Sequence, residues 1–345
     1  MTPYLPVGKL PYELLQKIIR SAPTSGSRVL LGPGVGLDCA VLEFGDTCLV
    51  LKTEPITFAS DEIGWYAVQI AANDIATTGA RPKWAMFTVL LPSGVTTERS
   101  ATNLADQLYA ACRGAGITVI GGHTEVTHDL NRPLIITTLL GEITRDQLIT
   151  PSGAQAGDVI LLTKGVPIEA TALLAREFPD RLRNALSPNE IETARNFLFD
   201  PGISVLLDAQ VAVKAGGVTA MHDPTEGGVA NALWEMAQAC QNTFLVDPAR
   251  VPILPLSAQI CQVFDLDPMG AIASGALLLT VRPDSKNDVI AALAGAGISA
   301  AEIGAVVTGV PQVLMPHQGM VRNLPRFDRD EIAKVYQQVF PDQMD

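Results

Sequence analysis

The chain has 345 residues, of which 48% are hydrophobic and 17% charged, and its net charge is -12. This composition excludes a disordered chain or a coiled coil, and the length allows two domains of ordinary size. No apolar run approaches the roughly 20 residues of a membrane span, and no basic cluster offers the positive charge that nucleic acid requires. Residues 1–10 lack the pattern of a signal peptide, so we expect a cytoplasmic protein without membrane or nucleic-acid partners.

A short amphipathic helix is predicted over residues 10–20. Residues 29–42, VLLGPGVGLDCAVL, then combine a glycine-rich turn with Asp38 at the head of a strand. Gly34 and Gly36 suit a sharp turn or a close approach of backbone to a ligand. The glycine spacing and the strand that follows disfavour a dinucleotide fingerprint, and with it an oxidoreductase. Asp38 is therefore either a site residue or an ordinary solvated turn residue.

An apolar strand, Cys48–Lys52, is predicted to run into Thr53, Glu54 and Pro55. A carboxylate at the end of such a strand is well placed for a site. Glu54 could equally be a residue of the following turn.

The stretch DEIGWYAVQIAANDIATTGARP, from Asp61 to Pro82, predicts a helix that opens on acids and closes at Gly79. Asp74 lies four residues after Ile70 and continues the buried face. An acid there points inward in the last turn, where the helix dipole disfavours it, so it needs a cation or several donors. The alternative is a capped or partly exposed Asp74 beside Asn73.

Three further elements of the first half are predicted as strand, helix and strand, at Trp84–Leu91, Glu98–Arg113 and Leu134–Ile143. Between the last two, ITVIGGHTEV at residues 117–126 brings an apolar strand to Gly121, Gly122, His123 and Thr124. Glycines at a strand end followed by these polar residues suit an anion or metal pocket. A single histidine can also be a hydrogen-bonded loop residue.

Small and turn-forming residues at 150–157, TPSGAQAG, predict a boundary between domains 1–150 and 151–345. Strands are then predicted at Asp158–Thr163, Ser274–Val281 and Glu302–Val307. Helices are predicted at Ile168–Glu177, Ser204–Lys214, Val229–Ala239, Ser285–Ala294 and Asp328–Phe340.

The loop HDPTEGG, residues 222–228, is the best candidate for chemistry in the second half, with Asp223 as its candidate catalytic residue. It precedes a helix, whose N-terminus offers free backbone NH groups to an anion. Alternatively, Thr225 and Glu226 cap that helix.

Five motifs, taken in order, resemble the ATP-binding aminoimidazole ribonucleotide (AIR) synthetase superfamily. They are GPGVGLDCAVL, KTEPITF, ANDIATTGARP, GGHTEV and DPTEGG, and they span nearly the whole chain. The superfamily includes selenophosphate synthetase, thiamine-monophosphate kinase and the hydrogenase-maturation carbamoyl dehydratase, and DPTEGG is most similar to the dehydratase. The resemblance implies an α/β (α+β) fold, with an N-terminal dimerising sheet domain and a C-terminal α/β sandwich. It also implies a homodimer that binds ATP near the subunit interface.

The resemblance further implies a magnesium site at Asp38, Glu54 and Asp74, since Mg²⁺ accepts carboxylate and phosphate oxygens. It places the nucleotide beside Gly34, Gly36, Thr53, Asn73, Asp74, Gly121, Gly122 and Thr124. His123 is a candidate acid or base, because the pKa of a histidine can lie near neutrality.

The chain departs from the family pattern at several positions. Leu37 replaces an acid that the family often carries, and Glu54 replaces an aspartate. His123 replaces the aspartate of a Gly-Asp-Thr motif, and Glu226 replaces an arginine, which reverses the charge near the nucleotide. The dehydratase uses a C-terminal cysteine, whereas this sequence ends PDQMD. We therefore expect that it does not run that chemistry in that way.

Two hypotheses follow. The first is an ATP- and magnesium-dependent enzyme that phosphorylates an oxygen of a small amide, carbamoyl or phosphate-bearing substrate. The second is a catalytically degenerate member of the superfamily that binds nucleotide or acts as a scaffold. The departures from the family pattern motivate the second hypothesis.

Overall fold

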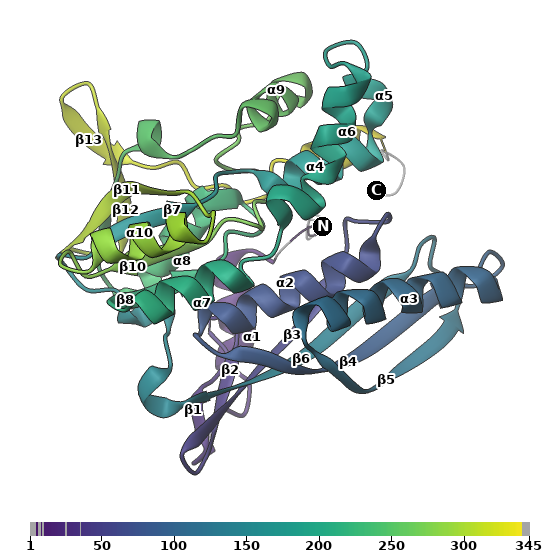
Figure 1. Ribbon diagram of the computed structural model, residues 1–345, viewed down its shortest axis with the longest axis horizontal. Helices are drawn as coiled ribbons and strands as arrows, with labels where there is room; N and C mark the ends of the chain where they lie inside the picture. The colour runs from purple at the N-terminus through teal and green to yellow at the C-terminus, as the bar shows by residue number, and fades with distance from the viewer. Residues whose placement is uncertain (1–4, 6–7, 9, 25, 35, 340–345) are drawn as a thin grey trace. The chain divides into compact units, whose positions relative to one another are not determined.

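The computed structural model describes residues 5, 8, 10–24, 26–34 and 36–339. The chain divides into two compact units. The first unit comprises residues 24–33 and 38–148, and the second comprises residues 1–23, 34–37 and 149–345. Each unit combines a β-sheet with helices (Figure 1), which confirms the α/β fold class.

The sheet of the first unit has six strands in the order β1-β2-β3-β6-β4-β5. Its strands are β1 (Val29–Leu31), β2 (Ala40–Phe44), β3 (Thr47–Ile56), β4 (Arg81–Pro92), β5 (Thr118–Thr127) and β6 (Leu134–Thr144). Neighbouring strands are antiparallel except β4 and β5. This parallel pair is joined through a helix, as parallel strands require.

Two helices, α2 (Ile63–Thr77) and α3 (Glu98–Ala115), lie side by side against the sheet of the first unit (Figure 1). Every residue of α2 except Trp65 is buried, as expected for a helix that is apolar on all sides. In α3 the buried face includes Leu104, Leu108 and Cys112, which confirms the predicted face. Both predicted helices are therefore present at nearly their expected bounds.

β3 and β5 of the first unit each continue well beyond their predicted C-terminal ends. β3 continues through Glu54 and Pro55 because its pairing with β6 extends to Ile56, whereas its pairing with β2 ends at Leu51. A proline is tolerated where one side of the strand is open, since its missing NH breaks no ladder bond there. β5 continues through the glycine pair and His123, which therefore lie in a strand rather than in a loop.

The second unit is built on a seven-stranded sheet in the order β13-β12-β9-β11-β7-β10-β8. Its strands are β7 (Val159–Thr163), β8 (Val218–His222), β9 (Thr243–Val246), β10 (Leu278–Val281), β11 (Ala300–Val307), β12 (Gln312–His317) and β13 (Met320–Asn323). Its α-helices are α1 (Tyr12–Arg20), α4 (Ile168–Glu177), α5 (Pro179–Leu182), α6 (Pro188–Asn196), α7 (Leu206–Ala215), α8 (Gly228–Cys240), α9 (Pro255–Phe264), α10 (Lys286–Gly295) and α11 (Ala333–Val339). Of the short turns of other helix types, η1 (Arg145–Gln147) belongs to the first unit, and η2 (Pro151–Gly153), η3 (Leu198–Gly202) and η4 (Pro248–Arg250) belong to the second.

Two elements of the second unit are shorter than predicted. β10 begins at Leu278 rather than Ser274, because Gly275 has a φ of 113° and breaks the strand geometry. α11 begins at Ala333 rather than Asp328, because the preceding Asp330 turns back to accept a hydrogen bond from the NH of Ile332. Residue 340 and the final PDQMD lie outside the described residues.

The core of the second unit forms where α8 packs against the sheet. Val229, Leu233 and Met236 of this helix are buried in one cluster with residues of β7, β9 and β10. The segment that leads into α8 is thereby fixed by the packing of the helix that follows it.

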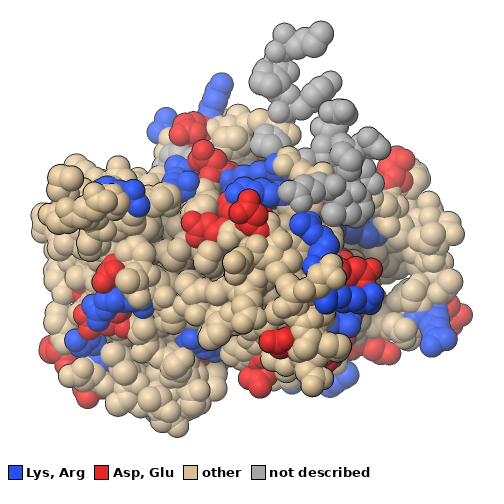
Figure 2. All heavy atoms as spheres, turned by 90° about the horizontal axis from the view of Figure 1, so that it is seen from above, with Lys and Arg blue, Asp and Glu red and all other residues tan. Residues whose placement is uncertain are grey.

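None of the helices in the described part of the chain has the length and apolar character needed to cross a bilayer. On the face shown in Figure 2, lysine and arginine side chains are interspersed with aspartate and glutamate. Charges of the two signs therefore lie in small mixed groups on that face.

Candidate functional site

A lysine and two acids meet in the first unit, between β3 and the last turn of α2. The Nζ atom of Lys52 lies 3.0 Å from Oδ2 of Asp74 and 3.0 Å from Oε2 of Glu54. Lys52 and Glu54 are two residues apart on β3, so their side chains project from the same face of the sheet. Asp74 is 2% exposed, which confirms that this acid points inward. We call these three residues the Lys52 cluster.

Asp38 belongs to the same neighbourhood. It lies two residues before Ala40, which pairs with Leu51, so the chain arrives beside the end of β3 that carries Lys52. Its negative charge acts on both Lys52 and Asp74. The structure thus brings together the three acids that the sequence suggested for magnesium. Their role as metal ligands stays a prediction.

The charges of the cluster perturb one another. Burial raises the pKa of Asp74 to about 7, because Lys52 only partly offsets the loss of water, and the charges of Asp38 and Glu54 add to the rise. Burial acts to lower the pKa of Lys52, but the three acids outweigh it and raise that pKa well above its ordinary value. The single ammonium group of Lys52 thus interacts with all three acids.

Two residues predicted to bind the nucleotide, Asn73 and Thr53, are neighbours of the cluster in the sequence, but they differ in position. Asn73 is fully buried next to Asp74 on α2. Thr53 lies between Lys52 and Glu54 on β3, and its side chain therefore points to the opposite face of the sheet. The structure thus separates Thr53 from the cluster that its neighbours form.

The glycine pair on β5 lies in one row with the cluster but at a distance from it. The strand registers align Glu54 with Thr137, Thr137 with Phe87, and Phe87 with Gly122. This row crosses three inter-strand spacings, so Glu54 and Gly122 are roughly 14 Å apart. A Cβ atom on Gly122 would lie 2.3 Å from the backbone oxygen of Phe87, so the packing of β5 against β4 alone already requires glycine.

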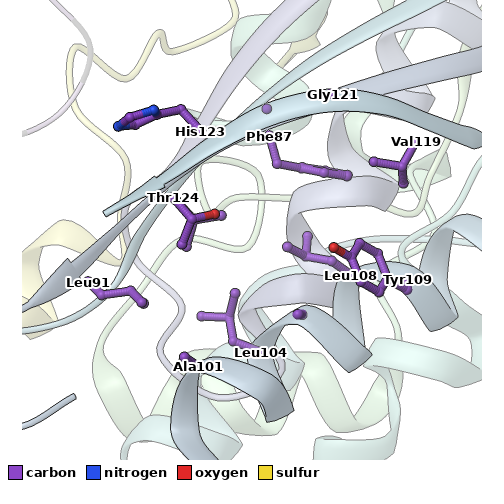
Figure 3. Close-up of a pocket in the computed structure, with 13 residues that line it drawn as sticks. Phe87, Leu91, Ala101, Leu104, Leu108, Tyr109, Val119, Gly121, His123 and Thr124 are labelled. Carbon is purple, nitrogen blue, oxygen red and sulfur yellow. The ribbon is translucent and has the colours of Figure 1, made fainter. Parts of the chain in front are cut away.

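A cavity of about 320 Å³ lies between β4, β5 and α3 (Figure 3). Apolar side chains, among them Phe87, Leu104 and Leu108, make most of its lining, and Gly121 and Thr124 border it on β5. Figure 3 shows the Thr124 side chain on the side of β5 that faces α3. The cavity can therefore hold a small group that is partly apolar, beside the side chains of Thr124 and Tyr109.

His123 points away from the other labelled side chains of this cavity (Figure 3). Its Nε2 atom lies 3.2 Å from Oε2 of Glu125, and both side chains are largely exposed. The structure therefore places His123 on the sheet face opposite Thr124, apart from the Lys52 cluster.

The remaining predicted residues lie in the second unit. Gly34 and Gly36 are grouped with it, and Gly36 adopts a φ of 74° beside the backbone of Glu235 on α8. Asp223 is fully buried in the segment between β8 and α8. The N-cap residue of α8 is Gly227, which has no side chain with which to cap the helix.

A second group of buried acids surrounds the start of α8. Oδ2 of Asp330 accepts a hydrogen bond of 2.6 Å from the NH of Gly227. Burial raises the pKa of Asp330 to about 7 and that of Glu169, on α4, to about 8, and the charge of Glu226 adds to both rises. Acids perturbed in this way are candidates for function, although burial alone accounts for most of the shift.

Sequence reasoning missed Lys52, Glu169 and Asp330. Lys52 had a readable signal, because it stands two residues before Glu54 on the same strand face. Glu169 and Asp330 lie far apart in the sequence, and neither continues a motif. Only the folded chain brings them to the same helix start.

Comparison with known proteins matches a family model to each half of the chain. The family model "AIR synthase related protein, N-terminal domain" matches residues 36–143, and "AIR synthase related protein, C-terminal domain" matches residues 155–314. The carbamoyl dehydratase HypE of Rhizobium leguminosarum bv. viciae is 30% identical over 267 residues, which cover 73% of this chain and 70% of the relative. A putative hydrogenase expression/formation protein of Methanocaldococcus jannaschii is 26% identical over 290 residues, covering 80% and 81%.

A solved structure shares the fold. The hydrogenase maturation protein HypE in complex with ATP superposes with a TM-score of 0.68 at 23% identity, over 92% of this chain and 91% of that one. The likeness confirms the two-domain fold that the motif order predicts. Both domain models and the relatives agree: the chain belongs to the AIR synthase-related family.

Proposed function

We propose that the protein uses ATP and magnesium to transfer a phosphoryl group to an oxygen of a small amide, carbamoyl or phosphate-bearing substrate. The observation that carries this proposal is the convergence of Asp38, Glu54 and Asp74 around Lys52 in the first unit. The similarity to a carbamoyl dehydratase and to a protein solved with ATP supports the same reading. Phosphorylation turns a poor leaving oxygen into a good one, and the protein contributes mainly position and charge.

The donor set fits magnesium, because carboxylate oxygens are its preferred protein ligands. The Lys52 contacts use one oxygen of Glu54 and one of Asp74, and each carboxylate has a second oxygen. Asp38, Glu54 and Asp74 would hold the ion, which when bound neutralises charge on the transferred phosphoryl group. Lys52 fixes two of these carboxylates against β3, so their geometry is set before the substrate arrives.

The nucleotide is proposed to extend from the Lys52 cluster toward the β5 cavity. Asn73, Gly121, Gly122 and Thr124 would line its path, and the partly apolar cavity beside Thr124 would take the base. A catalytic role for His123 or Asp223 stays a proposal that their present positions do not explain.

A homodimer formed through β5 is part of this proposal. β5 is the last strand in its sheet order and is exposed along nearly its whole length. Its apolar side chain Ile120 is 53% exposed. An unpaired edge with exposed apolar residues favours association with a second strand.

Ile120→Lys is expected to shift the protein from dimer to monomer, because a charged side chain on the edge strand opposes pairing. Sedimentation velocity at micromolar concentrations measures the change. The matched control is Val95→Lys, since Val95 is 70% exposed in the same unit but lies outside the sheet edge. Equal sedimentation of both variants and the unsubstituted protein would argue against a β5 interface.

Incubation with ATP, magnesium and a small-metabolite extract tests the enzymatic function. We expect ADP formation that depends on the protein and rises with one fraction of the extract. Failure to form ADP, in a folded protein that binds nucleotide, would instead support a nucleotide-binding or scaffolding role. The replacement of a family arginine by Glu226, near acids that already repel one another, is the observation that keeps this second role open.

A further inference from the structure

The ammonium group of Lys52 lies among three acids of the first unit, Asp38, Glu54 and Asp74. Without this lysine, Glu54 and Asp74 would lose the cation that both of them contact. The side chain of Lys52 is 14% exposed, and its ammonium group contacts one oxygen of Glu54 and one of Asp74, both at 3.0 Å. Glu54 and Lys52 share a strand face, and Asp74 faces them from α2. The ammonium group therefore stays close to both carboxylates, because it is part of the protein and cannot diffuse away as a free ion can.

A divalent ion that used the same pair of carboxylates would have to share them with this ammonium. Magnesium binds carboxylate oxygens at 2.0–2.1 Å and requires nearly octahedral geometry. An ion bound to the remaining oxygens would lie within a few ångströms of a fixed positive charge in a partly buried site, where repulsion is weakly screened. The phosphates of a nucleotide would add the negative charge that makes a second cation favourable.

We propose that Lys52 is the resident cation of the Glu54–Asp74 pair, so that the cluster does not collect a free divalent ion and receives magnesium only as its nucleotide complex. The first part concerns the protein alone, and the second rests on the proposed function. Lys52 is a positioning residue in this scheme, because it acts on the carboxylates rather than on the substrate. In this order of binding, Lys52 holds the two carboxylates in place before any metal binds. Magnesium and the triphosphate then bind together.

Mn²⁺ alone, titrated without nucleotide and followed by electron paramagnetic resonance, tests this inference. Four proteins are compared: unsubstituted, Asp74→Asn, Lys52→Met and the double variant Lys52→Met/Asp74→Asn. We expect the unsubstituted protein and Asp74→Asn to bind Mn²⁺ equally weakly. Lys52→Met should bind it at least tenfold more tightly, and the double variant should lose that gain. Asp106→Asn, an exposed position on α3, is the control for a change of net charge.

Two results would overturn the inference. One is Mn²⁺ binding by the unsubstituted protein that weakens tenfold or more in Asp74→Asn. The other is a folded Lys52→Met protein without any gain. If Lys52→Met does not fold, the unsubstituted protein is compared with Asp74→Asn alone. Equal Mn²⁺ binding by these two proteins would support the inference, and tenfold weaker binding by Asp74→Asn would overturn it. This readout contains no ATP, so failure of the proposed enzymatic function would leave it unchanged.

Discussion

Asp74→Asn is expected to lower the rate of ATP turnover, kcat, by about 100-fold or more while the protein still folds. The carboxylate is buried beside Lys52, where it can act on a phosphate-bound cation without competition from water. Asparagine keeps the shape and removes the charge. The fold should survive, because burial already disfavours the charge of Asp74, and Lys52 keeps its contact with Glu54. Steady-state ADP formation measures the loss.

The matched control for this variant is Asp106→Asn, the same substitution at an exposed position of α3 in the same unit. It should retain the full rate. Circular dichroism and thermal melting establish that each protein is folded. Turnover by Asp74→Asn equal to that of the control would remove the carboxylate cluster from the mechanism.

Glu169→Gln is expected to stabilise the second unit increasingly as pH rises. The folded protein raises the pKa of Glu169 from 4.5 to about 8, chiefly through burial. Below pH 4.5 the carboxyl is neutral in the folded and unfolded states and costs nothing. Between pH 4.5 and 8 the unfolded chain ionises while the folded one keeps its proton, so the free energy of unfolding falls.

Glutamine does not titrate, and the difference in unfolding free energy between variant and unsubstituted protein should therefore grow by about 4 kcal/mol over this window. Urea titrations at pH 4.5, 6 and 8 measure it. Glu192→Gln on α6 is the control, because that side chain is 76% exposed and should show little such dependence. A constant difference between Glu169→Gln and the unsubstituted protein at all three values would mean that Glu169 is ionised in the fold.

Much of the fold could be predicted from local sequence. Hydrophobic periodicity located α2 and α3, and it also indicated that Asp74 faces inward, since period and burial are properties of the helix itself. The order of the motifs indicated the family across both units. Each helix and each motif is a short stretch of sequence, so recognising it needs no knowledge of tertiary contacts.

The rest depended on partners that are distant in sequence. β5 passes through Gly121 and Gly122 because β4 lies alongside and leaves no space for a side chain at Gly122. Gly122, which indicated a ligand loop, is thus required by the packing of β5 against β4. Asp74 is paired with the ammonium group of Lys52. The inward-facing acid predicted that a cation lies nearby, but only the packing of α2 against β3 shows that Lys52 reaches it.

The central claim is that acids from separate segments of the first unit form a cation-dependent pocket for a triphosphate. Calorimetric titration of MgATP into the unsubstituted protein and into Glu54→Gln/Asp74→Asn tests it most directly. The account predicts saturable binding to the unsubstituted protein and an affinity at least tenfold lower in the double variant, a loss of about 1.4 kcal/mol or more. Equal MgATP affinity in the two folded proteins would contradict it.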